Sequence, residues 1–156
     1  MPRRTSARLL DAYRRTRRGD VVIVGLGIDL IENCRVEQEL ARGEWVGEDG
    51  IFSREEIRYC SLGRKPARRY AACFVAKEAA LKALGAGVGD LAIFREVEVK
   101  VGSGSKHEIV LHHRLQADAR RLGVGQVNLS IAASKRQTGA MVILESRAAG
   151  APRSDK

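Results

Sequence analysis

Apolar residues recur along this chain in short runs and in alternation with polar ones. A β-branched run from Val21 to Ile28 is bounded by glycines and predicts a buried strand that ends at Asp29. Four further segments of alternating or consecutive apolar residues predict strands: 97–101, 109–111, 127–131 and 141–144.

Helical segments are predicted between these strands. Ser53 and Glu56 have the Ser-x-x-Glu spacing of a capping box, so a helix is expected to start there and to end near Gly63. Pro66 suits the first turn of the next helix and Gly85 its end, and this helix is the longest that the sequence predicts. Two others are predicted by composition and spacing: 32–42 and 113–122.

The resulting order of elements is β-α-α-α-β-β-α-β-β. It predicts an α+β domain with a mainly antiparallel sheet and a long central helix. A chain of 156 residues fits one such domain. We therefore divide the chain into a basic N-terminal extension (1–20), a domain (21–146) and a loose C-terminal tail (147–156). A dinucleotide-binding fold is not indicated, because Leu30 stands where the third glycine of its fingerprint would be.

The net charge of +9 is unevenly distributed. Residues 1–20 contain seven arginines and two aspartates, a net +5, which leaves +4 for the other 136 residues. With seven aromatic residues in all and no basic-aromatic alternation, a nucleic-acid partner is not favoured over an acidic protein or a polyphosphate. No apolar run reaches the length of a membrane span, and three widely spaced cysteines fit the reducing cytoplasm.

Three charged residues are candidates for chemistry. Asp29, at the predicted strand end, can either cap the next helix or bind a hard cation. Glu78 and Lys82 are four residues apart and share one helix face. They are either a solvated ion pair or parts of a site in which Glu78 joins Asp29 at a divalent ion and Lys82 neutralises a phosphate.

Three blocks of sequence occur in a specific order and spacing: GIDLIENCRVE at 27–37, IFSREEIRYC at 51–60 and AKEAALKALGAG at 76–87. They resemble the three blocks of the holo-acyl-carrier-protein synthase family, which are 4′-phosphopantetheinyl transferases. The resemblance covers about residues 21–145. It implies a magnesium-dependent transfer of 4′-phosphopantetheine from coenzyme A to a serine of an acyl or peptidyl carrier protein, by a cytoplasmic homotrimer whose sites lie between subunits.

The resemblance also implies roles for individual residues. Asp29 and Glu78 match the two metal carboxylates, and Glu78 or a water it polarises is a candidate for removing the serine proton. Lys82 matches a catalytic lysine near the pyrophosphate, where it would stabilise the leaving group. Arg35 matches an arginine that contacts acidic residues of the carrier protein. Contacts to the coenzyme are expected from the end of the long helix: Lys82, Gly85 and Gly87.

The sequence departs from the family pattern at positions expected to bind the coenzyme. Cys73 stands where the family usually has an arginine, Ala133 where it has a histidine, and the segment 104–107 (GSKH) replaces the common Gly-Lys/Arg-Pro turn. Losing two charge-assisted hydrogen bonds of roughly 1.5–3 kcal/mol each would weaken coenzyme binding greatly unless other cations substitute. Five cations are candidates for this substitution: Arg68, Arg69, Lys106, Lys135 and Arg136.

These departures leave other functions open. One alternative is a repurposed relative, for example a dehydratase or isomerase, that acts on an acyl chain bound to the carrier. Another is a non-catalytic module that binds carrier proteins, and a third is a basic nucleic-acid binder. Cys73 is either a reactive thiol or, as its apolar neighbours favour, a small buried hydrophobe. His112 and His113 are not expected to bind a metal, because adjacent side chains point apart.

Overall fold

A computed structural model describes residues 21–47, 49–62, 64–87, 91–101 and 107–146. The predicted basic extension (1–20) and C-terminal tail (147–156) lie outside the described residues. The elements follow one another as β1 (Ile23–Glu32), α2 (Asn33–Arg42), α3 (Arg54–Ser61), α4 (Pro66–Leu84), the 3₁₀ helix η1 (Leu91–Glu96), β2 (Val97–Val101), β3 (His107–Leu111), α5 (His113–Arg121), β4 (Val124–Ala133) and β5 (Gln137–Ser146). The predicted α+β class and order of elements are confirmed, with η1 as an addition.

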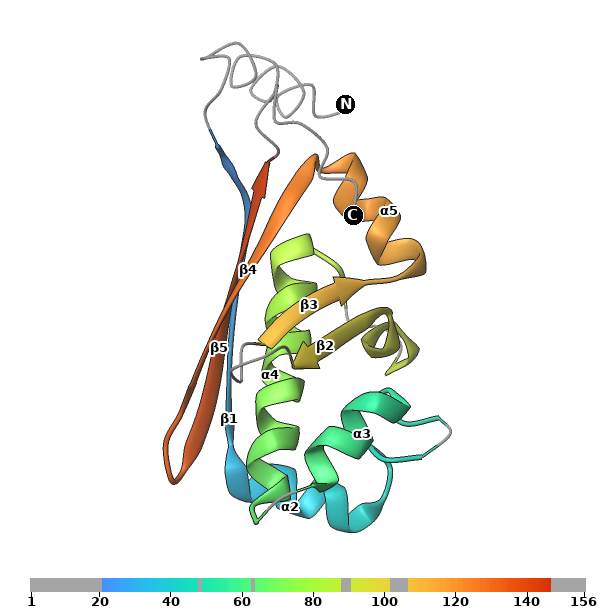
Figure 1. Cartoon of the computed structure of the whole chain (residues 1–156), viewed down its shortest axis with the longest axis vertical. Coiled ribbons are helices and arrows are strands. Elements are labelled where there is room, and N and C mark those ends of the chain that lie inside the picture. The colour runs from blue at the N-terminus through green and yellow to red at the C-terminus, as the bar shows by residue number, and fades with distance from the viewer. Residues whose placement is uncertain (1–20, 48, 63, 88–90, 102–106, 147–156) are drawn as a thin grey trace, which may run out of the picture.

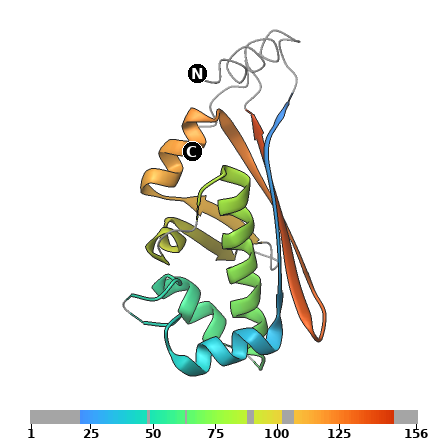
Figure 2. The ribbon, with the colours of Figure 1, turned by 180° about the vertical axis from the view of Figure 1, so that it is seen from behind.

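The strands form two antiparallel sheets. The larger sheet has the order β1-β5-β4, and the smaller one pairs β2 with β3. Helix α4 lies between them, against β1 and β5 on one side and against α3 and β2 on the other (Figure 1). The view from behind shows the same arrangement, with the long strands of the larger sheet forming one outer layer (Figure 2). The central helix predicted from the sequence is therefore the core of the fold.

The ends of α3 and α4 follow the predicted local chemistry. Ser53 Oγ accepts a hydrogen bond from the Glu56 amide at 3.2 Å, and a carboxylate oxygen of Glu56 accepts one from the Ser53 amide at 2.7 Å. This is the predicted capping box, although α3 ends at Ser61, earlier than expected. Helix α4 begins at Pro66 and ends before Gly85, which has a left-handed backbone with φ of 66°.

Strand β1 is longer than predicted. It continues beyond Asp29 to Glu32, with Asp29 opposite Ala140 of β5. Asp29 is consequently not the cap of α2, whose N-cap is Glu32, without a side-chain cap bond. The prediction that the strand ends at Asp29 was wrong because the polar residues after it still pair with β5. Side chains alternate between the two faces of a strand, so Asp29 lies on the same face of the sheet as Gly27 and Ile31. This is the face that α4 covers.

Helix α4 approaches β1 closely because small residues meet there. A Cβ atom at Gly27 would overlap the backbone oxygen of Ala79, and one at Gly25 would overlap that of Ala83. This contact brings the helix backbone beside the strand that carries Asp29. Within the described residues, no helix is long and apolar enough to cross a membrane.

Candidate active site

The first feature of the candidate site is a polar contact between β1 and α4. Lys82 Nζ donates hydrogen bonds to Asp29 Oδ1 at 2.7 Å and to the carbonyl oxygen of Ile28 at 3.3 Å. The side chain of Asp29 is 14% exposed and that of Lys82 is 49% exposed. The contact is therefore open to solvent on the lysine side and partly enclosed on the aspartate side.

Glu78 lies one helical turn before Lys82 and belongs to the same cluster. Partial burial raises the pKa of the Glu78 carboxyl, the negative charge of Asp29 raises it further, and the charge of Lys82 opposes both effects. The structure thus brings Asp29, Glu78 and Lys82 together, although they are spread over more than fifty residues of sequence. We refer to these three residues as the carboxylate cluster.

This cluster has the donors that a hard divalent cation prefers. Two carboxylates compete electrostatically, and a cation between them would relieve the repulsion that raises the pKa of Glu78. Among the residues that the structure describes, no group of three or more His, Cys, Asp or Glu could form a complete protein cage for a metal. An ion here would take its remaining ligands from water or from a substrate, which is the usual coordination of magnesium.

The other predicted coenzyme contacts lie at the end of α4. The Gly85 amide donates to the Lys82 carbonyl at 3.0 Å and the Ala86 amide to the Leu81 carbonyl at 2.9 Å, which closes the helix. Gly85 and Gly87 are both exposed beyond this cap. A Cβ at either glycine would meet no atom within 4 Å, so the space beside them is open. Their contact with a coenzyme stays a prediction.

Arg35 lies apart from the carboxylate cluster. It is exposed on α2, which follows the end of β1. Asn33, the first residue of α2, follows Asp29 after four residue steps of extended chain, a distance of about 13 Å. Arg35 is therefore not part of the carboxylate cluster, and its contact with a carrier protein stays a prediction.

A second hollow, which we call the basic pocket, lies between the N-terminal ends of α2 and α4 and the β4–β5 turn. Its volume is about 370 Å³. Four of its eight lining residues are cations and one is a carboxylate; the lining is Asn33, Glu37, Arg64, Lys65, Pro66, Ala67, Arg68 and Lys135. The salt bridges found in the described part of the chain do not include any of these four cations. Its unneutralised charge suits an anionic ligand.

The five cations that were candidates to replace the missing coenzyme contacts do not lie at one site. Arg68 and Lys135 line the basic pocket, whereas Arg136 is exposed but is not part of its lining. Arg69 donates to the carbonyl oxygens of Tyr59 and Leu62 and lies 4.7 Å from the centre of the Tyr59 ring, so it joins α3 to α4. Lys106 lies outside the described residues. Arg64 and Lys65 were not among the predicted candidates, although their positions just before Pro66 were an available signal.

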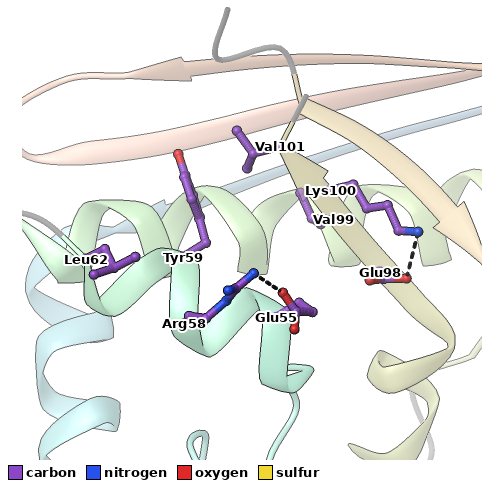
Figure 3. A pocket seen from close by; sticks show the side chains of 8 residues that line it. All are labelled: Glu55, Arg58, Tyr59, Leu62, Glu98, Val99, Lys100 and Val101. Atoms are coloured by element: carbon purple, nitrogen blue, oxygen red, sulfur yellow. Dashed lines mark hydrogen bonds and ion pairs between the residues drawn. The ribbon is translucent and has the colours of Figure 1, made fainter. Parts of the chain in front are cut away.

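A larger groove lies between α3 and β2 (Figure 3). It measures about 590 Å³ and is also lined by charged residues, but these are paired with one another. Arg58 binds Glu55 at 2.6 Å, and Lys100 lies 3.7 Å from Glu98. Because its charges are balanced, this groove is a weaker candidate for an anion site than the basic pocket.

Cys73 is not available for chemistry. Its side chain is fully buried, and its Sγ lies 3.6 Å from that of Cys60 on α3. The hydrogen bond with Cys60, together with burial, raises the pKa of the Cys73 thiol, so the reactive thiolate is disfavoured. The prediction that Cys73 is a buried hydrophobe is confirmed. Ala133, the other departure from the family pattern, is exposed at the end of β4.

Sequence reasoning missed the buried ion pair of the core. Lys77 and Glu56 form an ion pair at 2.9 Å, with both side chains 0% exposed. Glu56 had been explained as a capping residue alone. Lys77 lies four residues after Cys73 and four before Leu81, both fully buried, and this spacing was a signal for a lysine on an apolar helix face.

Comparison with known proteins identifies the family. The sequence model of the 4′-phosphopantetheinyl transferase superfamily matches residues 25–133. A holo-[acyl-carrier-protein] synthase from Geobacter sp. (strain M21) is 38% identical over 124 residues, which are 80% of this chain and 99% of that protein. The chain therefore belongs to the 4′-phosphopantetheinyl transferase superfamily and, within it, to the holo-acyl-carrier-protein synthase family.

Solved structures agree with this assignment. The holo-[acyl-carrier-protein] synthase of Neisseria meningitidis has a TM-score of 0.70 and 26% identity, over 80% of this chain and 100% of that one. A synthase from Bacillus anthracis str. Ames in complex with CoA has a TM-score of 0.64 and 32% identity, over 80% of this chain and 98% of that one. The predicted family and α+β fold are thus confirmed.

Proposed function

We propose that the protein transfers 4′-phosphopantetheine from coenzyme A to a serine of an acyl or peptidyl carrier protein, with the help of Mg²⁺. The observation that carries this proposal is the carboxylate cluster, in which β1 and α4 of a family member bring Asp29, Glu78 and Lys82 together. The names of the relatives also favour a transferase over the repurposed enzyme considered above.

In this mechanism Asp29 and Glu78 would hold the Mg²⁺ ion, which when bound would supply positive charge for the pyrophosphate. The serine oxygen attacks the β-phosphorus of coenzyme A while the bond from that phosphorus to the bridging oxygen breaks, and adenosine 3′,5′-bisphosphate leaves. Lys82 stabilises the charge on the leaving phosphate. Glu78, or a water that it polarises, is proposed to remove the serine proton.

The basic pocket is proposed to hold a further phosphate of the coenzyme. Arg68 and Glu78 are ten residues apart on α4, so their separation along the helix axis is about 15 Å. The 3′-phosphate and the 5′-pyrophosphate of coenzyme A are attached to one ribose and are closer together than this, so the long side chains of Arg68 and Lys135 would have to reach from the pocket toward the cluster. In this proposal Arg64, Arg68 and Lys135 supply the positive charge that Cys73 and Ala133 do not.

Two surfaces of the protein are proposed to contact partner molecules. Arg35 on α2 is proposed to contact acidic residues of the carrier protein. The outer face of the larger sheet exposes Leu26, Ile28 and Leu30 by 53%, 58% and 62%, and further copies of the chain in a homotrimer are proposed to cover it. The cytoplasm is the proposed location, because three free cysteines suit a reducing compartment.

The test is incubation of the protein with apo-carrier protein, coenzyme A and Mg²⁺, followed by mass spectrometry of the intact carrier. We expect a covalent phosphopantetheine increment that is lost with Glu78→Ala and retained with Glu108→Ala, an exposed glutamate of β3. No increment on several apo-carriers would contradict the proposal. High affinity for an acyl-loaded carrier without transfer would then favour the repurposed enzyme.

A further inference from the structure

The buried ion pair of Lys77 and Glu56 connects four elements. Lys77 Nζ donates to the carboxylate of Glu56 at 2.9 Å and to the carbonyl oxygens of Phe94 and Val97 at 2.9 and 2.5 Å. Its three N–H groups are thereby all used. These bonds join α4 to α3, to η1 and to β2. Burial lowers the pKa of Lys77, and the neighbouring Glu56 carboxylate opposes this effect.

Glu56 completes the same network from α3. Its Oε1 accepts a hydrogen bond from the Val99 amide at 2.7 Å, while Oε2 accepts from the Ser53 amide at 2.7 Å. In the two-stranded sheet, β3 pairs with one edge of β2 only. The ion pair binds the Val97 carbonyl and the Val99 amide at the other edge, where a third strand would otherwise do so.

On the side of α4 that faces β1, the directional contact is the partly exposed one from Lys82 to Asp29 and the Ile28 carbonyl, and the rest of the contact with β1 involves small residues. Gly25 and Gly27 of β1 meet the helix backbone at Ala83 and Ala79. Interlocking ridges and grooves of side chains normally determine how a helix is rotated and placed along its neighbour. Glycine and alanine form shallow ridges, so this part of the contact restricts sliding and rotation of α4 less than the fully buried ion pair on its other side does.

We propose that the Lys77–Glu56 pair is a positioning device that sets the axial position and rotation of α4 and thereby holds Glu78 beside Asp29. This inference rests on the proposed function, because it concerns the alignment of the two proposed metal carboxylates. Glu78 directly follows Lys77, so any shift of the helix at Lys77 moves Glu78 by a similar amount. A misplacement of about 1 Å in an active site can cost about 100-fold in rate.

The main test variant is the double substitution Lys77→Met with Glu56→Gln. It removes both charges together, whereas Lys77→Met alone leaves a buried unpaired carboxylate and is expected to unfold the protein. The amide oxygen introduced by Glu56→Gln can still accept the hydrogen bond of the Val99 amide. Leu115→Ala, which truncates a fully buried residue of α5 outside the pair, is the control for a general loss of packing.

We expect the folded double variant to have a kcat at least about 10-fold lower and to need about 10-fold more Mg²⁺ for half-maximal activity. Its KM for the carrier protein should stay within about 3-fold of the wild type, since the α2 surface is not altered. Leu115→Ala should lose stability but keep both activity parameters. A folded double variant with the wild-type kcat and Mg²⁺ requirement would show that the pair is only structural and would overturn the inference.

Crystal structures of the wild type and the double variant separate this inference from the proposed function. A change of about 1 Å or more in the position of Glu78 relative to Asp29 supports the positioning role even if the wild type transfers no phosphopantetheine. An unchanged position overturns it whatever the activity. If the double variant does not fold, Lys77→Gln with Glu56→Gln, which removes both charges but keeps a hydrogen-bond donor at position 77, is measured in the same way. Wild-type kcat with an unchanged Glu78 position then overturns the inference.

Discussion

At the scale of single residues, Lys82 neutralises the carboxylate that the proposed cation would bind. A cation between Asp29 and Glu78 would take over this neutralisation and release the Lys82 ammonium for a phosphate oxygen. Ion pairs with one exposed partner contribute about 0–1 kcal/mol, and Lys82 is 49% exposed, so its displacement costs little. One lysine can therefore hold the metal-free cluster together and later bind the substrate.

The stability of the metal-free protein is expected to depend on pH through Glu78. Burial and Asp29 raise its pKa on folding, so the folded protein keeps this proton at pH values where the unfolded chain has lost it. The stability that Glu78 contributes in the metal-free protein is therefore present at low pH and is lost as pH rises through the raised pKa. We expect Glu78→Gln to raise the melting temperature by about 1–3 °C at pH 8 and to change it little near pH 4.

Thermal melts in the presence of a chelator measure this difference, with Glu108→Gln as the control for an exposed glutamate. Added Mg²⁺ should stabilise the wild type at pH 8 and should not stabilise Glu78→Gln. An equal effect of Glu78→Gln at both pH values would contradict the proposed environment of this carboxyl.

At the scale of elements, the sequence correctly predicted the structural features that depend on contacts between residues close together in the chain. The capping box at Ser53 and the glycine end of α4 were predicted correctly because each involves contacts within one or two helical turns. The end of β1 was wrong because pairing with β5, more than a hundred residues away, extends the strand past Asp29. The bond from Val99 to Glu56 spans 43 residues of sequence, and no local pattern predicts it.

Binding of coenzyme A is expected to depend on the cations at the N-terminal end of α4. Arg68→Ala and Lys135→Ala each remove a cation of the basic pocket, and each should weaken the binding of coenzyme A by about 10-fold or more, the usual effect of losing a charge-assisted hydrogen bond. Arg136→Ala is the matched control, since it removes the same type of charge next to Lys135 but outside the lining. Calorimetry with coenzyme A and Mg²⁺ measures the three dissociation constants.

An equal effect of all three substitutions would indicate general electrostatic attraction, and no effect of Arg68→Ala or Lys135→Ala would assign the phosphates to other cations. Restoring the family arginine at Cys73 is not a useful test. The side chain at this position is fully buried against Cys60, so an arginine would be forced into the core.

At the scale of the whole molecule, the residues of the carboxylate cluster were predicted by the family resemblance, and the fold explains their convergence. The basic pocket could not be predicted in the same way. Its lining comes from α2, from the first turn of α4 and the two residues before it, and from the β4–β5 turn, and only the tertiary fold brings Arg68 and Lys135 to one hollow. Composition showed a surplus of positive charge but not where the folded chain gathers it.

The proposed homotrimer gives the last prediction. Ile28 and Leu30 project from the outer face of β1, and Met141 lies directly opposite Ile28 on β5, where it is 37% exposed. A charge on this face should prevent its burial by another copy, so Ile28→Glu should convert the trimer to a monomer at micromolar concentration. Leu91→Glu is the control, because Leu91 is 54% exposed but lies on η1, away from the sheet. Light scattering after gel filtration measures the mass of each variant. Because sites between subunits need two copies, the monomer should also lose transferase activity while keeping its fold, and a monomeric wild type with full activity would contradict the shared site.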